Sequence, residues 1–101
     1  MNKDFGLKEG DIEQIIQVLA NCIEIKKAVV FGSRAKGNYK AGSDIDLAIW
    51  SENAGAVLKT DGKLNDETLL PYQFDLVNYD TINNEALKEH IDRIGIEIYK
   101  R

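Results

Sequence analysis

Two aspartates one residue apart, Asp44 and Asp46, begin an apolar segment in the sequence SDIDLAIW. In an extended strand, residues two apart project from the same face, about 6.6 Å apart along the chain. At that separation two carboxylates repel each other and raise each other's pKa. A divalent cation removes this repulsion, and Mg²⁺ prefers carboxylate oxygens while it retains waters and phosphates as further ligands. The pair therefore indicates a seat for one or two Mg²⁺ ions, although two solvated aspartates on an exposed edge would give the same pattern.

A second group of residues is suited to binding an anion. Gly32 and Ser33 end the short β-branched segment AVVF and run into a helical turn. Glycine lets the backbone approach a ligand closely, and the first N–H groups of a helical turn carry partial positive charge. These residues predict a cradle for the terminal phosphates of a nucleotide, and an ordinary serine-capped turn is the alternative. Arg34 and Lys36 in the same turn either assist at the phosphates or are solvated side chains.

A third carboxylate, Asp75, lies in the middle of the apolar sequence QFDLV. A lone aspartate inside an apolar strand is costly to bury unless it has a partner. A metal ion shared with Asp44 and Asp46 would be such a partner. Asp66 and Asp80 are rivals for this role, but neither lies in the middle of a predicted strand.

The elements that must position these residues alternate between helix and strand. Apolar residues recur at helical spacing from Ile12 to Ile23, with Asp11 as the candidate N-cap, and short β-branched or alternating segments predict strands. We expect helices at residues 11–23, 84–94 and, more weakly formed, 54–60, and strands at residues 28–31, 45–50, 72–79 and 96–100. This order predicts a single domain of residues 1–101 with an α/β (α+β) fold, a small mixed sheet with helices packed mainly on one face.

The composition excludes several classes of protein. The net charge of −4 argues against extended nucleic-acid contact, which needs a basic surface. There is no apolar run of about 18 residues to span a membrane and no apolar segment of a signal peptide near the N-terminus. The single cysteine, Cys22, cannot form an internal disulfide, and there is no Cys/His cluster for a structural zinc ion. We therefore expect a cytoplasmic protein.

Four other residues receive no assigned role. We expect Cys22 to pack as a small side chain and His90 to be exposed, because it is one position away from the apolar line of its helix. Trp50 is expected either in the core or in contact with a base or partner. Tyr39 is expected either on the surface or in contact with a nucleotide.

The motif FGSRAKG…SDIDL resembles the nucleotidyltransferase superfamily related to DNA polymerase beta. It is most similar to the minimal branch, the MNT proteins that pair with HEPN-domain proteins, and the resemblance runs from the first helix through the third strand. The resemblance implies a nucleotidyltransferase fold. It also implies that Gly32 and Ser33 hold the β- and γ-phosphates of a nucleoside triphosphate, that Asp44 and Asp46 bind two Mg²⁺ ions, and that Asp75 completes the second metal site and helps to deprotonate the attacking hydroxyl.

The same resemblance implies a reaction and a partner. Members of the superfamily transfer a nucleoside monophosphate, usually from ATP, and release pyrophosphate. MNT proteins act as antitoxins of HEPN ribonuclease toxins, and some transfer AMP to a tyrosine of the toxin. We therefore expect an Mg²⁺-dependent adenylyltransferase that uses ATP and modifies a HEPN partner, within a homo- or hetero-oligomer. Two alternatives stay open: a non-catalytic antitoxin that masks its partner, and transfer to a small molecule such as an aminoglycoside.

Overall fold

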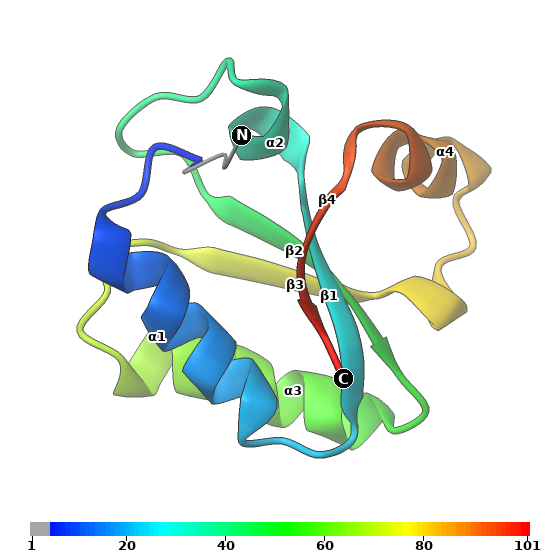
Figure 1. Cartoon of the computed structure of the whole chain (residues 1–101). Coiled ribbons are helices and arrows are strands. Elements are labelled where there is room, and N and C mark those ends of the chain that lie inside the picture. The colour runs from blue at the N-terminus through cyan, green and yellow to red at the C-terminus, as the bar shows by residue number, and fades with distance from the viewer. Residues whose placement is uncertain (1–4) are drawn as a thin grey trace.

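A four-stranded mixed sheet forms the centre of the protein (Figure 1). The structure, a computed structural model, describes residues 5–101. The strands are β1 (Ile25–Phe31), β2 (Ile45–Ser51), β3 (Phe74–Asn78) and β4 (Ile96–Lys100). They lie in the order β3-β2-β1-β4, with β1 antiparallel to both of its neighbours and β2 parallel to β3. The predicted small mixed sheet is confirmed.

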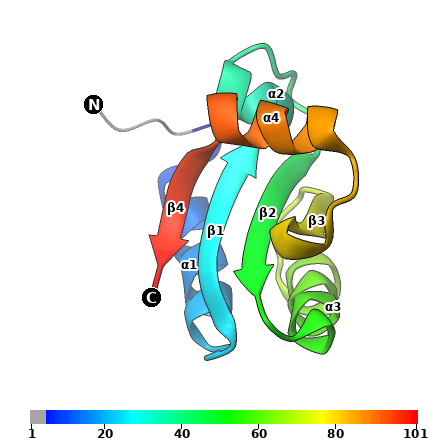
Figure 2. The same ribbon diagram turned by 90° about the vertical axis from the view of Figure 1, so that its right-hand side faces the viewer.

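Helices cover both faces of this sheet. Helices α1 (Glu9–Ala20) and α3 (Ala54–Gly62) pack on one face, and a π-helical turn, Lys63–Glu67, continues α3. Helix α4 (Glu85–Ile94) crosses one end of the opposite face, as Figure 2 shows, with α1 and α3 behind the sheet. The short helix α2 (Gly32–Lys36) follows β1 at that same end. The α/β class is confirmed. The helices were expected mainly on one face of the sheet, and α4 is the one that packs on the other face.

The alternation of residues along β2 assigns its side chains to the two faces. Ile45, Leu47 and Ile49 are fully buried in the larger core with α1 and α3. Asp46 and Trp50 project from the other face, toward the side that α4 covers. Because aliphatic burial is worth about 25 cal/mol per Å², the aliphatic residues fix the register, and that register places Asp46 on the α4 face.

The element boundaries differ from prediction at α1 and β1. Asp11 is not the N-cap; it lies in the first turn of α1, where its carboxylate accepts the Lys8 backbone N–H at 3.1 Å and the Tyr72 hydroxyl at 2.7 Å. The helix ends at Ala20, so Ile23 lies beyond it and is 74% exposed. The shortened helix lets β1 begin at Ile25, three residues before the predicted start.

The weakly predicted third helix is regular. The Asn53 side chain caps α3 by accepting the Gly55 N–H at 2.8 Å, because the backbone N–H groups of the first helical turn have no carbonyl partner within the helix. Cys22 is half-buried against the larger core, which confirms its packing role. Among residues 5–101, no helix has the length and apolar character needed to cross a membrane.

Candidate active site

The turn that ends β1 places Gly32 and Ser33 at one end of the sheet. Gly32 adopts a positive φ of 74°, a conformation that favours glycine. Helix α2 ends at Gly37, whose N–H donates to the Ser33 carbonyl at 2.9 Å. The predicted phosphate-binding pair therefore lies where a strand turns into a helix, while phosphate binding itself stays a prediction.

Gly32 packs directly against the carboxylate of Asp46. The antiparallel pairing of β1 and β2 puts Phe31 opposite Asp46, so Gly32 follows at the level of that carboxylate. A methyl group on Gly32 would overlap Oδ2 of Asp46. The two halves of the sequence motif, separated by ten residues, are therefore in contact, and a glycine at position 32 is what leaves room for this contact.

The three predicted carboxylates lie on or next to the paired strands β2 and β3. Asp46 lies directly opposite Asp75 in the parallel pair, and Asp44 immediately precedes β2. Burial, followed by the negative charges of Asp75 and Asp44, raises the pKa of the Asp46 carboxyl from 3.8 to about 6. Asp75 is the third acid that the strand pattern favoured. Asp75 is exposed, so the expectation of a buried charge that needs a partner is wrong. Its rivals Asp66 and Asp80 lie outside the β2–β3 pair, in the π-helical turn and in the 3₁₀ turn after β3.

This set of donors fits Mg²⁺. The ion is usually held by one or two protein carboxylates, and waters and substrate phosphates complete its octahedral shell. The opposed Asp46 and Asp75 supply such a pair, and a bound cation would relieve the repulsion that raises the pKa of Asp46. Within the described part of the chain, no three or more Asp, Glu, His or Cys side chains gather closely enough to enclose an ion on their own. Water and phosphate oxygens would therefore have to supply the remaining ligands.

Arg34 is buried rather than solvated. Its side chain is 1% exposed, so the interpretation of a solvated side chain is wrong. The guanidinium donates to backbone carbonyls of the N-terminal segment and of the loop before β2, with distances of 2.8 Å to Phe5 O and 2.9 Å to Ser43 O. The predicted contact of Arg34 with nucleotide stays a prediction, but the guanidinium is directed into the protein. Lys36, by contrast, is exposed at the end of α2.

Asn65, which the sequence analysis did not single out, holds the edge strand beside Asp75. Its carboxamide oxygen accepts the Phe74 N–H at 2.8 Å, and its amide nitrogen donates to the Phe74 carbonyl at 3.1 Å. The same nitrogen donates to Asp61 Oδ1 at 2.8 Å. One side chain thus pairs with the edge strand as a neighbouring strand would. An asparagine in a polar stretch gives no sequence signal for this role.

Aromatic contacts attach α4 to the face that carries Asp46. The centroids of the His90 and Phe31 rings lie 6.1 Å apart, and the two rings are nearly perpendicular. The prediction of an exposed His90 is wrong, because α4 crosses the end of β1 that carries Phe31 and the imidazole is half-buried there. Further along the face, Trp50 stacks on Tyr79 at 4.4 Å. The Tyr79 hydroxyl donates to Asp92 of α4 at 2.7 Å. Trp50 therefore has a packing partner within the chain.

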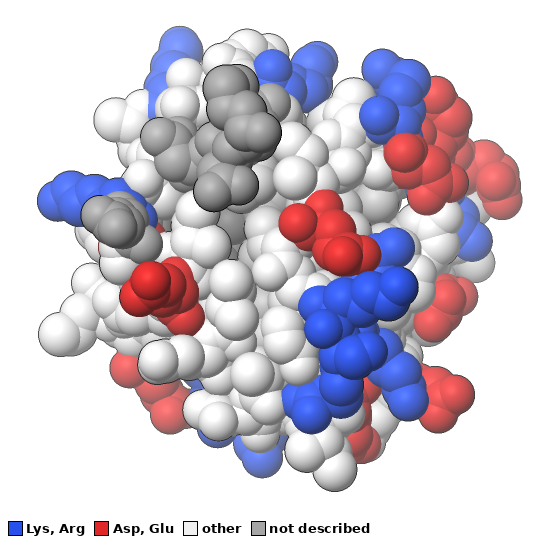
Figure 3. Space-filling model, in the orientation of Figure 1, with Lys and Arg blue, Asp and Glu red and all other residues white. Residues whose placement is uncertain are grey.

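Basic side chains gather at the other end of β1. Lys27 lies opposite Lys100 of β4, and the exposed Arg101 follows, where Figure 3 shows basic side chains around the end of β4. This group is separated from the Gly32 turn by the length of β1. It is therefore too far away to contact phosphates held at Gly32 and Ser33.

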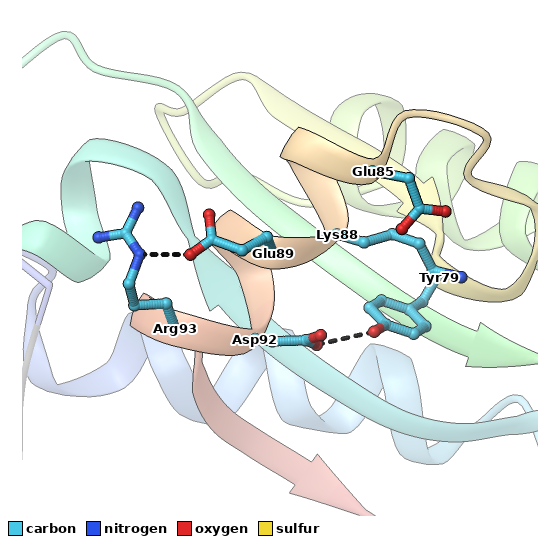
Figure 4. Close-up of a pocket in the computed structure, with 6 residues that line it drawn as sticks. All are labelled: Tyr79, Glu85, Lys88, Glu89, Asp92 and Arg93. Carbon is cyan, nitrogen blue, oxygen red and sulfur yellow. Dashed lines mark hydrogen bonds and ion pairs between the residues drawn. The ribbon is translucent and has the colours of Figure 1, made fainter.

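An open groove of about 440 Å³ lies beside α4 (Figure 4), and none of the three aspartates lines it. Tyr79 and the α4 residues Glu85, Lys88, Glu89, Asp92 and Arg93 line it. Glu89 accepts a hydrogen bond from Arg93 at 2.9 Å, and Asp92 accepts the Tyr79 hydroxyl. The charged groups of this groove are largely engaged with one another, so it does not form part of the candidate site.

Comparison with known proteins identifies relatives of the whole chain. The family model described as "Polymerase beta, Nucleotidyltransferase" matches residues 13–101. The chain is 31% identical over 98 residues to a Haemophilus influenzae protein named "Probable protein adenylyltransferase MntA", and the match covers 94% of this chain and 84% of that protein.

Solved structures share the fold. A toxin-antitoxin complex with AMP-PNP contains a chain that matches with a TM-score of 0.73 and 23% identity, over 90% of this chain and 74% of that one. A complex of a tri-AMPylated Shewanella oneidensis HEPN toxin with an MNT antitoxin matches with a TM-score of 0.65 and 21% identity, over 89% of this chain and 70% of that one. At these identities the likeness shows the fold.

Proposed function

The chain belongs to the polymerase beta nucleotidyltransferase family, and we propose that it transfers AMP from ATP, with Mg²⁺, to a tyrosine hydroxyl of a HEPN-domain partner. The observation that carries the proposal is the position of Asp46, which lies against Gly32 on one side and opposite Asp75 on the other. The relative named as a protein adenylyltransferase supports the proposed reaction, and the fold neighbours in complexes with a HEPN toxin or with AMP-PNP support the partner and the nucleotide.

The proposed reaction exchanges the phosphoanhydride bond between the α- and β-phosphates of ATP for a phosphoester bond to the acceptor oxygen. The acceptor oxygen bonds to the α-phosphorus of ATP, the bond from that phosphorus to the bridging oxygen breaks, and pyrophosphate leaves. Gly32 and Ser33 hold the β- and γ-phosphates at the turn into α2. Asp44 and Asp46 hold both metal ions, and Asp75 helps to hold the second. When bound, Mg²⁺ neutralises charge on the attacking and leaving oxygens.

The proton of the acceptor hydroxyl passes to Asp75. This carboxylate is exposed on the edge strand β3, where an acceptor on another protein can reach it. Asp46 is half-buried, and burial together with the nearby carboxylates makes its charge costly in the absence of a cation, which is why its pKa is raised. The different exposure of the two residues supports a division of roles, with Asp46 as the fixed ligand and Asp75 as the group that meets the acceptor.

The test is co-expression with the protein encoded beside this chain, which the proposal expects to contain a HEPN domain, followed by intact mass and peptide mapping of that protein. We expect added AMP on a tyrosine with the wild type and an unmodified partner with Asp44→Ala. If the partner is bound and inhibited but carries no AMP with either protein, the chain acts by masking. If AMP is found only on a small molecule supplied as an alternative acceptor, the proposed acceptor is wrong.

A further inference from the structure

We propose that Arg34 is a positioning residue that holds Asp44, the first of the metal-binding aspartates, beside the phosphate-binding turn. The role assigned to those aspartates rests on the proposed function. Arg34 follows Ser33 in α2, and its guanidinium is tied to the loop that leads into Asp44. Its side chain therefore adds a further link between the two halves of the motif, which are already joined by the pairing of β1 with β2 and by the contact of Gly32 with Asp46.

The contacts of Arg34 converge on the residue before Asp44. Nε and Nη2 donate to the Ser43 carbonyl at 3.2 Å and 2.9 Å, and Nη2 also approaches the Ala41 carbonyl at 3.4 Å. Much of this loop is exposed, including Lys40 and Gly42. Because Ser43 and Asp44 share a peptide bond, the position of the Ser43 carbonyl restrains where Asp44 begins.

The guanidinium itself has several partners. It lies near the rings of Tyr39 and Tyr72, at 5.3 Å and 5.2 Å from their centroids. Nη1 donates to Phe5 O at 2.8 Å, and the Tyr72 hydroxyl continues the network to Asp11 of α1. A buried cation is costly unless its donors are satisfied, so this environment stabilises a single orientation of the side chain.

The geometry requires arginine in particular. A planar guanidinium can lie near aromatic rings while its fork donates to several carbonyls, whereas a lysine ammonium is a point donor on a flexible stem. Arg34→Lys keeps the charge and removes the fork. This substitution therefore separates the positioning of the loop from the simple presence of a positive charge.

The first test measures binding of Mn²⁺ alone to the metal-free protein by electron paramagnetic resonance, without nucleotide. Residues that orient metal ligands typically change metal affinity by about 10- to 100-fold when they are replaced. We expect Arg34→Lys to raise the Mn²⁺ Kd about tenfold, and amide exchange at residues 40–44 to become faster. The control is Asn53→Ala, which removes the α3 cap and lowers stability at a distance from this loop.

The second test separates positioning from direct nucleotide contact. If Arg34 acts by positioning, Arg34→Lys raises the Mg²⁺ concentration needed for half-maximal activity. The KM for ATP, measured at saturating Mg²⁺, then stays within about twofold of the wild-type value. A change confined to the KM for ATP, with unaltered Mn²⁺ binding, overturns the proposal in favour of direct contact. Mn²⁺ binding equal to that of wild type also overturns it, whatever the change in Tm.

Tyr39→Leu keeps every donor of Arg34 but removes one of the two rings near its guanidinium, and it serves if Arg34→Lys does not fold. We expect a smaller rise in the Mn²⁺ Kd, about threefold, with faster exchange over the same loop; no change in either measurement contradicts the proposal. These readouts need no acceptor protein. Absence of AMP transfer by the wild type would therefore refute the proposed function without deciding the role of Arg34.

Discussion

The carboxylate of Asp46 occupies the space in which a side chain at Gly32 would begin. This contact joins the phosphate-binding turn to the metal-binding strand across the β1–β2 pair. Both the spacing between the two halves of the motif and the glycine at position 32 are therefore needed for this one contact between Gly32 and Asp46.

Gly32→Ala is predicted to disable the site. The substitution adds strain at a φ of 74° and displaces the Asp46 carboxylate. A displacement of this kind can lower the rate about 100-fold, and the strain costs roughly 1–3 kcal/mol of stability. Gly37→Ala is the matched control, because Gly37 also has a positive φ, of 93°, but has open space around it. Equal losses of activity in the two variants would contradict the steric argument.

Asp46→Asn is predicted to stabilise the metal-free protein at pH 7 while it abolishes nucleotidyl transfer. The substitution removes a half-buried charge that Asp75 and Asp44 repel. Because Asp46 is partly exposed, solvent screening limits the gain to the order of 1 kcal/mol. Urea unfolding in EDTA measures this gain, with the exposed Asp66→Asn as control. A loss of stability in Asp46→Asn would show that its charge is not repelled in the folded state.

The same charge predicts how stability varies with pH. The folded-state pKa of Asp46, about 6, exceeds its ordinary value of 3.8, so the folded protein binds more protons than the unfolded chain between these values. Its contribution to the free energy of unfolding therefore falls as pH rises from about 4 to about 7. The difference in unfolding free energy between Asp46→Asn and wild type should grow over this range in EDTA and shrink when Mg²⁺ is added. A difference that is constant with pH would contradict the assignment.

Asn65→Ala is predicted to lower kcat about 10-fold or more, because Asp75 follows the residue that Asn65 holds at both backbone groups. Asn53→Ala removes the α3 cap, which is worth about 1 kcal/mol of stability, and should leave kcat unchanged. Steady-state kinetics compare the two variants well below their Tm. If both lower kcat to the same extent, Asn65 has only a structural effect.

Asp75→Asn is predicted to lower the rate by at least about 100-fold, the scale of losing a positioned proton acceptor. Asp66→Asn and Asp80→Asn should have little effect, since both residues are exposed in turns outside the β2–β3 pair. The measurement is AMP transfer at saturating ATP and Mg²⁺. A strong loss of AMP transfer in Asp66→Asn or Asp80→Asn would contradict the assignment of Asp75 as the third catalytic carboxylate.

The sequence was sufficient to predict the features that depend on local periodicity. Alternation along residues 45–50 correctly put Asp46 on the face opposite Ile45 and Leu47. The strand predicted at residues 72–79 does bring Asp75 opposite Asp46, but Asp75 is the second residue of β3 and is exposed rather than buried in mid-strand. The small mixed sheet followed from the order of the elements.

The contacts that support the site could not be predicted in this way. Arg34 reaches a carbonyl 29 residues away, at Phe5, and Asn65 pairs with a strand nine residues away, so neither leaves a periodic signal. His90 lies one position off the apolar line of α4, yet it is half-buried because α4 crosses the end of β1. Such contacts depend on how the elements cross in space.

The most direct measurement of the central claim is transfer of label from ATP carrying ³²P at the α-phosphate to the purified HEPN-domain partner, in the presence of Mg²⁺. The account predicts that wild type labels the partner and that label from the γ-phosphate is not transferred. It also predicts that the Asp46→Asn protein, although folded, leaves the partner unlabelled. Equal labelling by wild type and Asp46→Asn, or no labelling of the partner by wild type, would contradict the account.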